Sequence, residues 1–202
     1  MTPVGAAERG ASLVELLVSL LFVSILSAMS YGFARAALRS AWVQEVKSEA
    51  QEVTVMALEI LARDVRSAGF NAAGPPIVPA IRAATRGSLE VLADLNGDGD
   101  TSDSNERIAY AYDGNKRQLM RATGGGWPQP VVQNVPSEGF TLSYFDAQGT
   151  ELPAGGANMS EDQRRLIRRI DVALQVEIAN PDPRVTAPLT SVVSSSICLR
   201  NP

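Results

Sequence analysis

The sequence predicts an α+β protein in which one long N-terminal α-helix is followed by, and packs on, an antiparallel β-sheet domain. Three observations predict this class. An apolar stretch of membrane-spanning length occupies residues 11–34, an amphipathic helical pattern without proline continues to residue 69, and strand-like, turn-rich sequence begins near residue 77. A helical region followed by a run of strands is typical of α+β folds.

The apolar stretch reads ASLVELLVSLLFVSILSAMSYGFA and contains a single charged residue, Glu15. At about 1.5 Å per residue, a helix of this length spans roughly 36 Å, which is enough to cross a bilayer. A lone carboxylate in the middle of a membrane helix costs about 2.5–3.5 kcal/mol, so its presence predicts a specific partner. The alternative is an ordinary signal anchor whose Glu15 lies at the membrane interface, near the positive end of the helix dipole.

The ten residues before this stretch end in Arg9-Gly10, directly in front of the apolar run. A general secretory signal places its small residues after the apolar core, where its peptidase cuts. Here the expected cut lies before the core, after Gly10. The hydrophobic helix is therefore expected to remain in the processed protein.

Arg9-Gly10 followed by Ala-Ser-Leu-Val-Glu-Leu-Leu resembles the class III leader of type IV pilins and of type II secretion pseudopilins. The resemblance implies a type IV pilin fold and a leader, residues 1–10, that the prepilin peptidase/methyltransferase removes. Cleavage would fall between Gly10 and Ala11, with N-methylation at Ala11 and Glu15 as the fifth mature residue. Ala11 departs from the family, which usually has phenylalanine at this place.

This resemblance supplies a partner for Glu15. Cleavage would create an α-amine at Ala11 that stays cationic when methylated. In a filament, Glu15 of one subunit could meet the amine of its neighbour, which would offset the desolvation of both charges and set the axial register. Glu15 is therefore expected to serve assembly, with no catalytic residue in the chain.

Residues 35–69 are expected to continue the same helix into the globular domain, because large apolar residues recur at helical spacing between charged ones. The helix is expected to end near Gly69 and the breaker Gly74-Pro75-Pro76. A free coiled coil is the rival interpretation, but the heptads are few and imperfect. The apolar positions are Leu38, Trp42, Val46, Val53, Met56, Ile60 and Val65.

The end of this segment, Arg-Asp-Val-Arg-Ser-Ala-Gly-Phe at residues 63–70, resembles a phrase found at the end of the long helix in PilW-like minor pilins. The resemblance implies a minor rather than a major pilin. The charged side chains Arg63, Asp64 and Arg66 are expected to form a solvated helix end, with the arginines near the negative end of the helix dipole.

Residues 75–202 are expected to form a β-rich head. Alternation is clearest at 171–178, where Val172, Leu174, Val176 and Ile178 share one face, as in a strand with one side in water. A short helix is expected after the N-cap residue Ser160. The predicted strands are 77–84, 88–93, 107–112, 118–122, 131–135, 140–146, 169–179 and 189–200.

One stretch of the head, residues 94–106, has the composition of a metal site. Asp94, Asn96 and Asp98 alternate before Gly99, as in the first half of a calcium loop, but the glutamate comes one residue late for an EF-hand. Acidic residues repel one another without a cation, which favours Ca²⁺. The alternative is an acidic hairpin turn in which Asn-Gly and Asp-Gly supply positive φ. The possible ligands are Asp94, Asn96, Asp98, Asp100, Asp103 and Glu106.

Composition narrows the chemistry of the chain. It contains no histidine, which excludes Ser-His-Asp and Cys-His catalysis and imidazole metal sites, and its only cysteine, Cys198, has no partner for an intrachain disulfide. Cys198 is expected to be a small buried residue of the last strand. The net charge is −4, and the arginines at 164, 165, 168 and 169 form only a local cluster, so no nucleic-acid binding is expected. No enzymatic activity and no required cofactor are predicted.

The expected function is a structural minor pilin that helps to initiate or cap a type IV pilus. Its expected partners are other minor and major pilins, the inner-membrane assembly platform and a tip adhesin. The expected location is the bacterial inner membrane, with one crossing and a periplasmic head, and then the filament. The alternatives are a minor pseudopilin of a type II secretion system (J type), a competence pilus subunit and, in another class, a membrane-anchored periplasmic ligand-binding protein.

Overall fold

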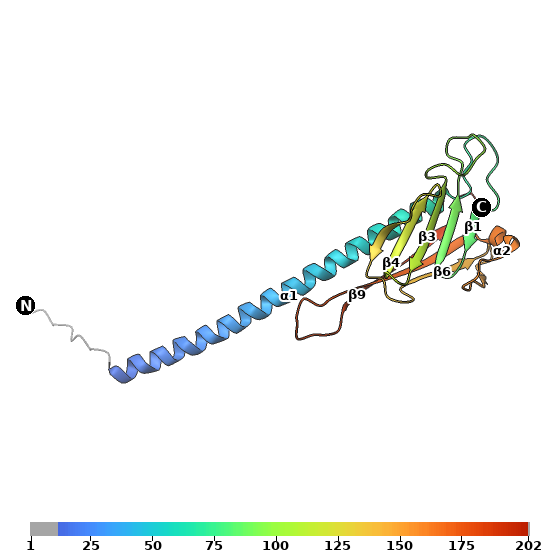
Figure 1. The fold of residues 1–202 in the computed structure, drawn as a ribbon. Helices are drawn as coiled ribbons and strands as arrows, with labels where there is room; N and C mark the ends of the chain where they lie inside the picture. Colours follow the sequence, from blue (N-terminus) through green and yellow to red (C-terminus); the bar gives the residue numbers. More distant parts are fainter. Residues whose placement is uncertain (1–11, 202) are drawn as a thin grey trace, which may run out of the picture. The chain divides into compact units, whose positions relative to one another are not determined.

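The computed structural model describes residues 12–201, so the predicted cleavage between Gly10 and Ala11 lies outside the described residues. The chain divides into two compact units, residues 1–44 and 45–202, and each is described separately. Helix α1 (Leu13–Ser67) begins in the first unit and ends in the second (Figure 1). The remaining elements belong to the second unit, the head.

Helix α1 confirms the prediction of one uninterrupted helix. No proline occurs between residues 12 and 67 to interrupt its hydrogen bonds. The chain leaves the helix at Gly69, whose φ of +78° favours glycine. A Cβ atom on Gly69 would lie 2.0 Å from the carbonyl oxygen of Asn201, so no other residue fits here without a shift of the backbone.

The buried side of α1 differs from the predicted one. Of the large apolar residues expected to form the stripe, only Val65 is buried, while Val53 and Met56 are exposed. The true stripe contains several alanines, which allow the helix to approach the sheets closely. Its residues are Ala50, Thr54, Ala57, Leu58, Leu61, Ala62 and Val65. This stripe packs against the β-sheets of the same chain, as predicted in preference to a free coiled coil.

The first sheet is a five-stranded antiparallel meander in the order β1-β2-β3-β4-β5. Each strand pairs with the next one in the chain, through short connections everywhere except between β2 and β3. The strands are β1 (Ile81–Ala84), β2 (Ser88–Leu92), β3 (Arg107–Asp113), β4 (Gln118–Thr123) and β5 (Gln129–Gln133). The acidic segment 94–106 is the connection between β2 and β3.

The second sheet is also antiparallel and has the order β7-β6-β8-β9. Strand β8, one of its two long strands, buries Ile170, Val172, Leu174 and Val176, which confirms the predicted alternation. Strand β9 pairs with β8 over its whole length and forms one edge of the sheet. The strands are β6 (Phe140–Phe145), β7 (Glu151–Leu152), β8 (Arg169–Ile178) and β9 (Leu189–Cys198).

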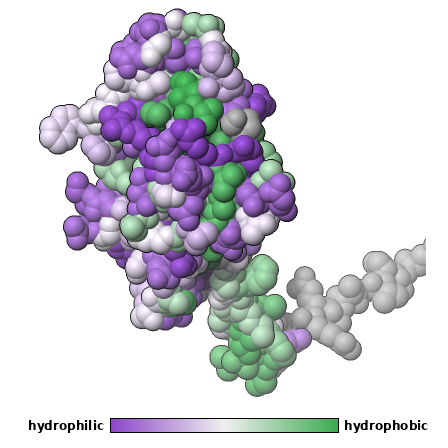
Figure 2. Space-filling view, turned by 90° about the vertical axis from the view of Figure 1, so that its right-hand side faces the viewer, coloured by the Kyte–Doolittle hydropathy of each residue, from purple (hydrophilic) through white to green (hydrophobic). Residues whose placement is uncertain are grey.

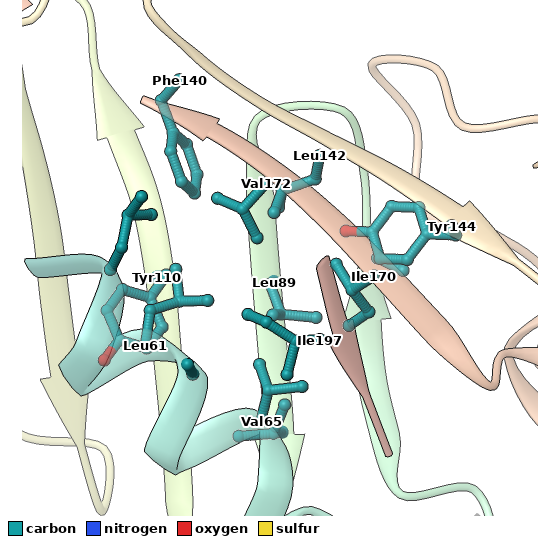
Figure 3. Packing of buried hydrophobic residues seen from close by; sticks show 14 of the residues in the cluster. Leu61, Val65, Leu89, Tyr110, Phe140, Leu142, Tyr144, Ile170, Val172 and Ile197 are labelled. Atoms are coloured by element: carbon teal, nitrogen blue, oxygen red, sulfur yellow. The ribbon is translucent and has the colours of Figure 1, made fainter. Parts of the chain in front are cut away.

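One hydrophobic cluster connects α1 with both sheets. In Figure 3, Leu61 and Val65 of α1 face side chains from the two sheets, including Tyr110 of β3 and Ile170 of β8. All four are essentially inaccessible to solvent. Burial of apolar area of this kind is the main stabilising contribution in a domain of this size.

The short elements fit their sequence signals to different degrees. Helix α2 (Glu161–Leu166) follows Ser160, and a capping box joins Ser160 and Gln163 reciprocally, as the N-cap residue predicted. Strand β1 begins at residue 81, later than the predicted 77, because Pro79 cannot donate to a ladder. The two-residue strand β7 was not predicted, since it has no periodicity to detect.

Candidate functional site

The first functional feature is the exposed apolar surface of α1. Every residue from 12 to 38 is exposed, including large side chains such as Phe22 and Leu26. Among the described residues, this is the helix that is long and apolar enough to cross a membrane. Figure 2 shows hydrophobic side chains over the visible face of this helix, whereas the head surface is largely hydrophilic. An exposed apolar surface of this extent is typical of a membrane or protein contact.

Two serines within this apolar segment are satisfied inside the helix, whereas its one carboxylate is not. The hydroxyls of Ser19 and Ser24 donate to the carbonyl oxygens of Glu15 and Leu20, each at 2.8 Å. This bonding lets serine enter an apolar environment without an unsatisfied donor. The carboxylate is that of Glu15, which lies in the first helical turn and contacts no cation or hydrogen-bond donor among residues 12–201.

With respect to residues 12–201, Glu15 is thus an unpaired charge on an apolar surface. The next charged residue along the helix is Arg35, which stacks on Tyr31 with its guanidinium carbon 5.7 Å from the ring centroid. The positive end of the helix dipole favours a carboxylate in the first turn but does not neutralise it. A cationic group from outside the described residues would do so.

The second feature is the connection 94–106, which separates into a buried and an exposed part. Asp94 and Glu106 are buried, at 1% and 2% exposure. Asp94 accepts hydrogen bonds from the backbone N–H groups of Gly97 (2.6 Å) and Gly99 (2.9 Å). Glu106 uses Oε1 to accept from the N–H groups of Leu95 (2.9 Å) and Asn96 (3.2 Å).

The exposed part is held together by Asn96. Its side-chain amide donates to Asp98 and to Asp103, both at 3.0 Å. The Asp100 carboxylate bonds within its own turn. It accepts hydrogen bonds from the Ser102 hydroxyl and from the N–H groups of Thr101 and Ser102. These hydrogen bonds, that of the Ser102 hydroxyl foremost, lower the pKa of Asp100 below its ordinary value.

The six predicted calcium ligands therefore do not converge as one set. Within residues 12–201, no three carboxylate or thiolate side chains are grouped closely enough to hold a metal ion. The physical reason is that backbone and side-chain hydrogen-bond donors of the loop already occupy most of the carboxylate oxygens. The turn interpretation is correct in part, because Gly97 and Gly99 have φ of +81° and +85°.

The end of α1 contains a third polar cluster that the sequence did not reveal. Asp64 is 8% exposed rather than solvated, and its carboxylate accepts hydrogen bonds from the Tyr110 hydroxyl (2.6 Å) and from Nε of Arg121 (2.9 Å). These partners lie 46 and 57 residues away on β3 and β4. Burial, together with the neighbouring Asp64, raises the pKa of Tyr110 above its usual range.

Two further predictions concern single residues. Cys198 is exposed at the end of β9, not buried as expected, because the alternation of the strand turns Ile197 into the core instead. Arg63 and Arg66 are exposed as predicted, and they line a groove beside β9 together with Phe70 and Arg200. The groove forms only where the last turns of α1 lie beside β9 and the C-terminal residues, so no sequence signal marked it.

Comparison with family models, with curated proteins and with solved structures finds no match to this chain. The function is therefore inferred from the residues and from the arrangement described above.

Proposed function

We propose that this protein is a structural minor pilin, anchored by α1 and incorporated through it into a type IV pilus that it helps to initiate or cap. One observation carries the proposal: Glu15 is the only charge in residues 13–34, and the surface around it is apolar and fully exposed. A helix of this kind suits both a bilayer and the apolar core of a helical filament.

In this proposal, cleavage after Gly10 supplies the missing cation. The new α-amine of Ala11 would lie one helical turn from Glu15 in the same subunit and would be available to Glu15 of a neighbour. Pairing in an apolar environment strengthens the attraction and penalises every other axial offset. The resemblance of residues 63–70 to PilW-like minor pilins supports a minor subunit.

The head would then determine the position of the subunit and its neighbours in the filament. The proposed partners are the prepilin peptidase/methyltransferase, other minor and major pilins, the assembly platform of the inner membrane and a tip adhesin. A minor pseudopilin of a type II secretion system shares the same N-terminal arrangement. The genes beside this one would separate the two: a secretin and secretion ATPase on one side, further minor pilins and an adhesin on the other.

The test uses two substitutions in the full chain, expressed with its own peptidase and filament system. Gly10→Val should abolish leader removal, so the protein should migrate at the size of the precursor. Glu15→Gln should be processed normally yet be at least about tenfold depleted from sheared filaments, since loss of about 1.4 kcal/mol of pairing corresponds to a factor of ten.

Glu49→Gln is the matched control, because Glu49 is an exposed acid on the same helix outside the apolar segment. It should be processed and incorporated like the wild type. Removal of the leader from the Gly10→Val protein, or normal incorporation of the Glu15→Gln protein, would contradict the proposal. Mass spectrometry of the sheared filaments would also identify the N-terminal residue and the neighbouring subunits.

A further inference from the structure

One oxygen atom of the head is buried without any hydrogen-bond partner. Glu106 is 2% exposed, and while its Oε1 accepts two backbone hydrogen bonds, its Oε2 is inaccessible to solvent and has no donor in the described part of the chain. Leaving a buried polar atom unsatisfied costs about 1–3 kcal/mol, and more for a charged group. An unpaired buried carboxylate oxygen therefore points to a missing ligand.

The same turn holds a second buried carboxylate, that of Asp94. The N–H groups of residues 95 and 96 bind Glu106, and the next N–H, that of Gly97, binds Asp94. Three consecutive amides of one turn thus hold both carboxylates. The backbone also joins the two ends of the segment, since the N–H of Ala93, the residue before Asp94, donates to the carbonyl oxygen of Glu106 at 2.7 Å.

No basic side chain compensates these two charges. Residues 94–106 contain no lysine or arginine, and the neighbouring Arg107 forms its ion pair with Glu90. Among the ion pairs of the described residues, none includes Asp94 or Glu106. Asp98 and Asp103 add exposed negative charge to the same loop. Like charges held in one buried turn repel one another, and a bound cation would offset that repulsion.

We propose that Glu106 and Asp94 bind one calcium ion, with Glu106 Oε2 as its primary ligand. The remaining positions would be taken by water and by neutral oxygens of the loop, which Ca²⁺ accepts readily in its six to eight ligands. Mg²⁺ demands a near-octahedral set and retains its water, and Zn²⁺ prefers the nitrogen and sulfur ligands that this loop lacks. This site is smaller than the six-ligand loop expected from the sequence.

Bound calcium would also secure the chain as it leaves α1. The N–H of Asp94 donates to the carbonyl oxygen of Phe70 at 2.8 Å, and the N–H of Ala72 donates to the carbonyl oxygen of Asp94 at 3.0 Å. The cation would therefore order residues 70–72 together with the loop. This inference is independent of the proposed filament role, and its test uses a different measurement.

The test compares thermal unfolding of the full chain in detergent micelles with about 5 mM CaCl₂, with about 5 mM MgCl₂ and with a chelator, concentrations above the 10⁻⁴–10⁻³ M dissociation constants of extracellular calcium modules. Calcium should raise the melting temperature by several degrees over the chelator, and magnesium should not. Calcium should also slow amide hydrogen exchange at residues 70–72 and 94–106.

Glu106→Gln should lose the calcium response, while the matched control Glu151→Gln, an exposed acid of β7, should keep it. Asp103→Asn, in the exposed part of the loop, should keep most of the calcium response. It provides a second loop variant to measure if the Glu106→Gln protein does not fold. If the wild-type protein has the same melting temperature with calcium as with the chelator, the proposal is wrong.

Discussion

At the scale of single residues, the decisive features are four carboxylates and the groups around them. Glu15 lies on an exposed apolar surface, Asp64 lies under the sheet, and Asp94 and Glu106 lie under a turn. Asp64 is paired within the head and is structural. Within residues 12–201, by contrast, the Glu15 carboxylate and Oε2 of Glu106 have no partner.

The structural role of Asp64 predicts a loss of stability in Asp64→Asn. The substitution keeps the shape but leaves the guanidinium of Arg121, whose side chain is 25% exposed, without its anion. We expect the free energy of unfolding to fall by about 2–3 kcal/mol in denaturant titrations. The control is Glu177→Gln, which breaks a more exposed pair with Arg117 and should cost under about 1 kcal/mol. Equal losses in the two variants would contradict this assignment.

At the scale of elements, α1 combines two surfaces in one helix. Residues 12–38 are exposed throughout, and from Ala50 onward a stripe of small and branched apolar residues is buried. The change from one surface to the other requires no break in the backbone, because the helix hydrogen bonds are the same in lipid, in a filament and on a sheet. The same element can thus serve as an anchor and as part of the core.

The buried stripe of α1 can be tested with two substitutions one turn and a half apart. Leu61→Ala removes a side chain that is fully buried, and the cavity should lower the free energy of unfolding by about 2–5 kcal/mol. Met56→Ala alters a side chain that is 56% exposed and should have a far smaller effect. The measurement is denaturant titration in micelles. A larger loss of unfolding free energy in Met56→Ala than in Leu61→Ala would contradict the assignment of the buried stripe.

At the scale of the whole molecule, the head is one core built from α1 and two antiparallel sheets. Each sheet contributes a buried tyrosine, Tyr110 on β3 and Tyr144 on β6. Tyr144 donates its hydroxyl proton to the carbonyl oxygen of Thr85 at 2.8 Å. Burial raises the pKa of both phenols above the ordinary value near 10, so both sheets respond to alkaline pH in the same direction.

This shared response predicts alkaline unfolding of the head. Below pH 10 both tyrosines are protonated in the folded and unfolded states, and stability is unaffected by them. Above pH 10 the unfolded chain releases their protons while the folded head retains them, so the free energy of unfolding falls with rising pH. The double variant Tyr110→Phe/Tyr144→Phe should lose stability less steeply than the wild type between about pH 10 and 11.5, as measured by thermal unfolding. An unchanged slope would contradict the prediction.

Much of the architecture could be read from the sequence because it depends on local signals. Proline-free helical sequence predicted α1, period-two alternation predicted β8, and Ser160 predicted the start of α2. The buried stripe of α1 was misplaced because the pattern was judged by its large residues. The sheets instead select the face with alanines, where close packing is possible.

The sequence by itself determined the α+β class, the apolar helix with its single carboxylate and the positions of most strands. Only the tertiary structure decided which charges are buried and what they meet. Asp64 accepts hydrogen bonds from Tyr110 and Arg121, which lie more than 40 residues away in the sequence. In place of the predicted six-ligand loop, the structure has two buried carboxylates, Asp94 and Glu106, and Oε2 of Glu106 has no hydrogen-bond partner within residues 12–201. The physical reason is that periodicity is a property of neighbouring residues, whereas burial and hydrogen-bond satisfaction depend on groups that only folding brings together.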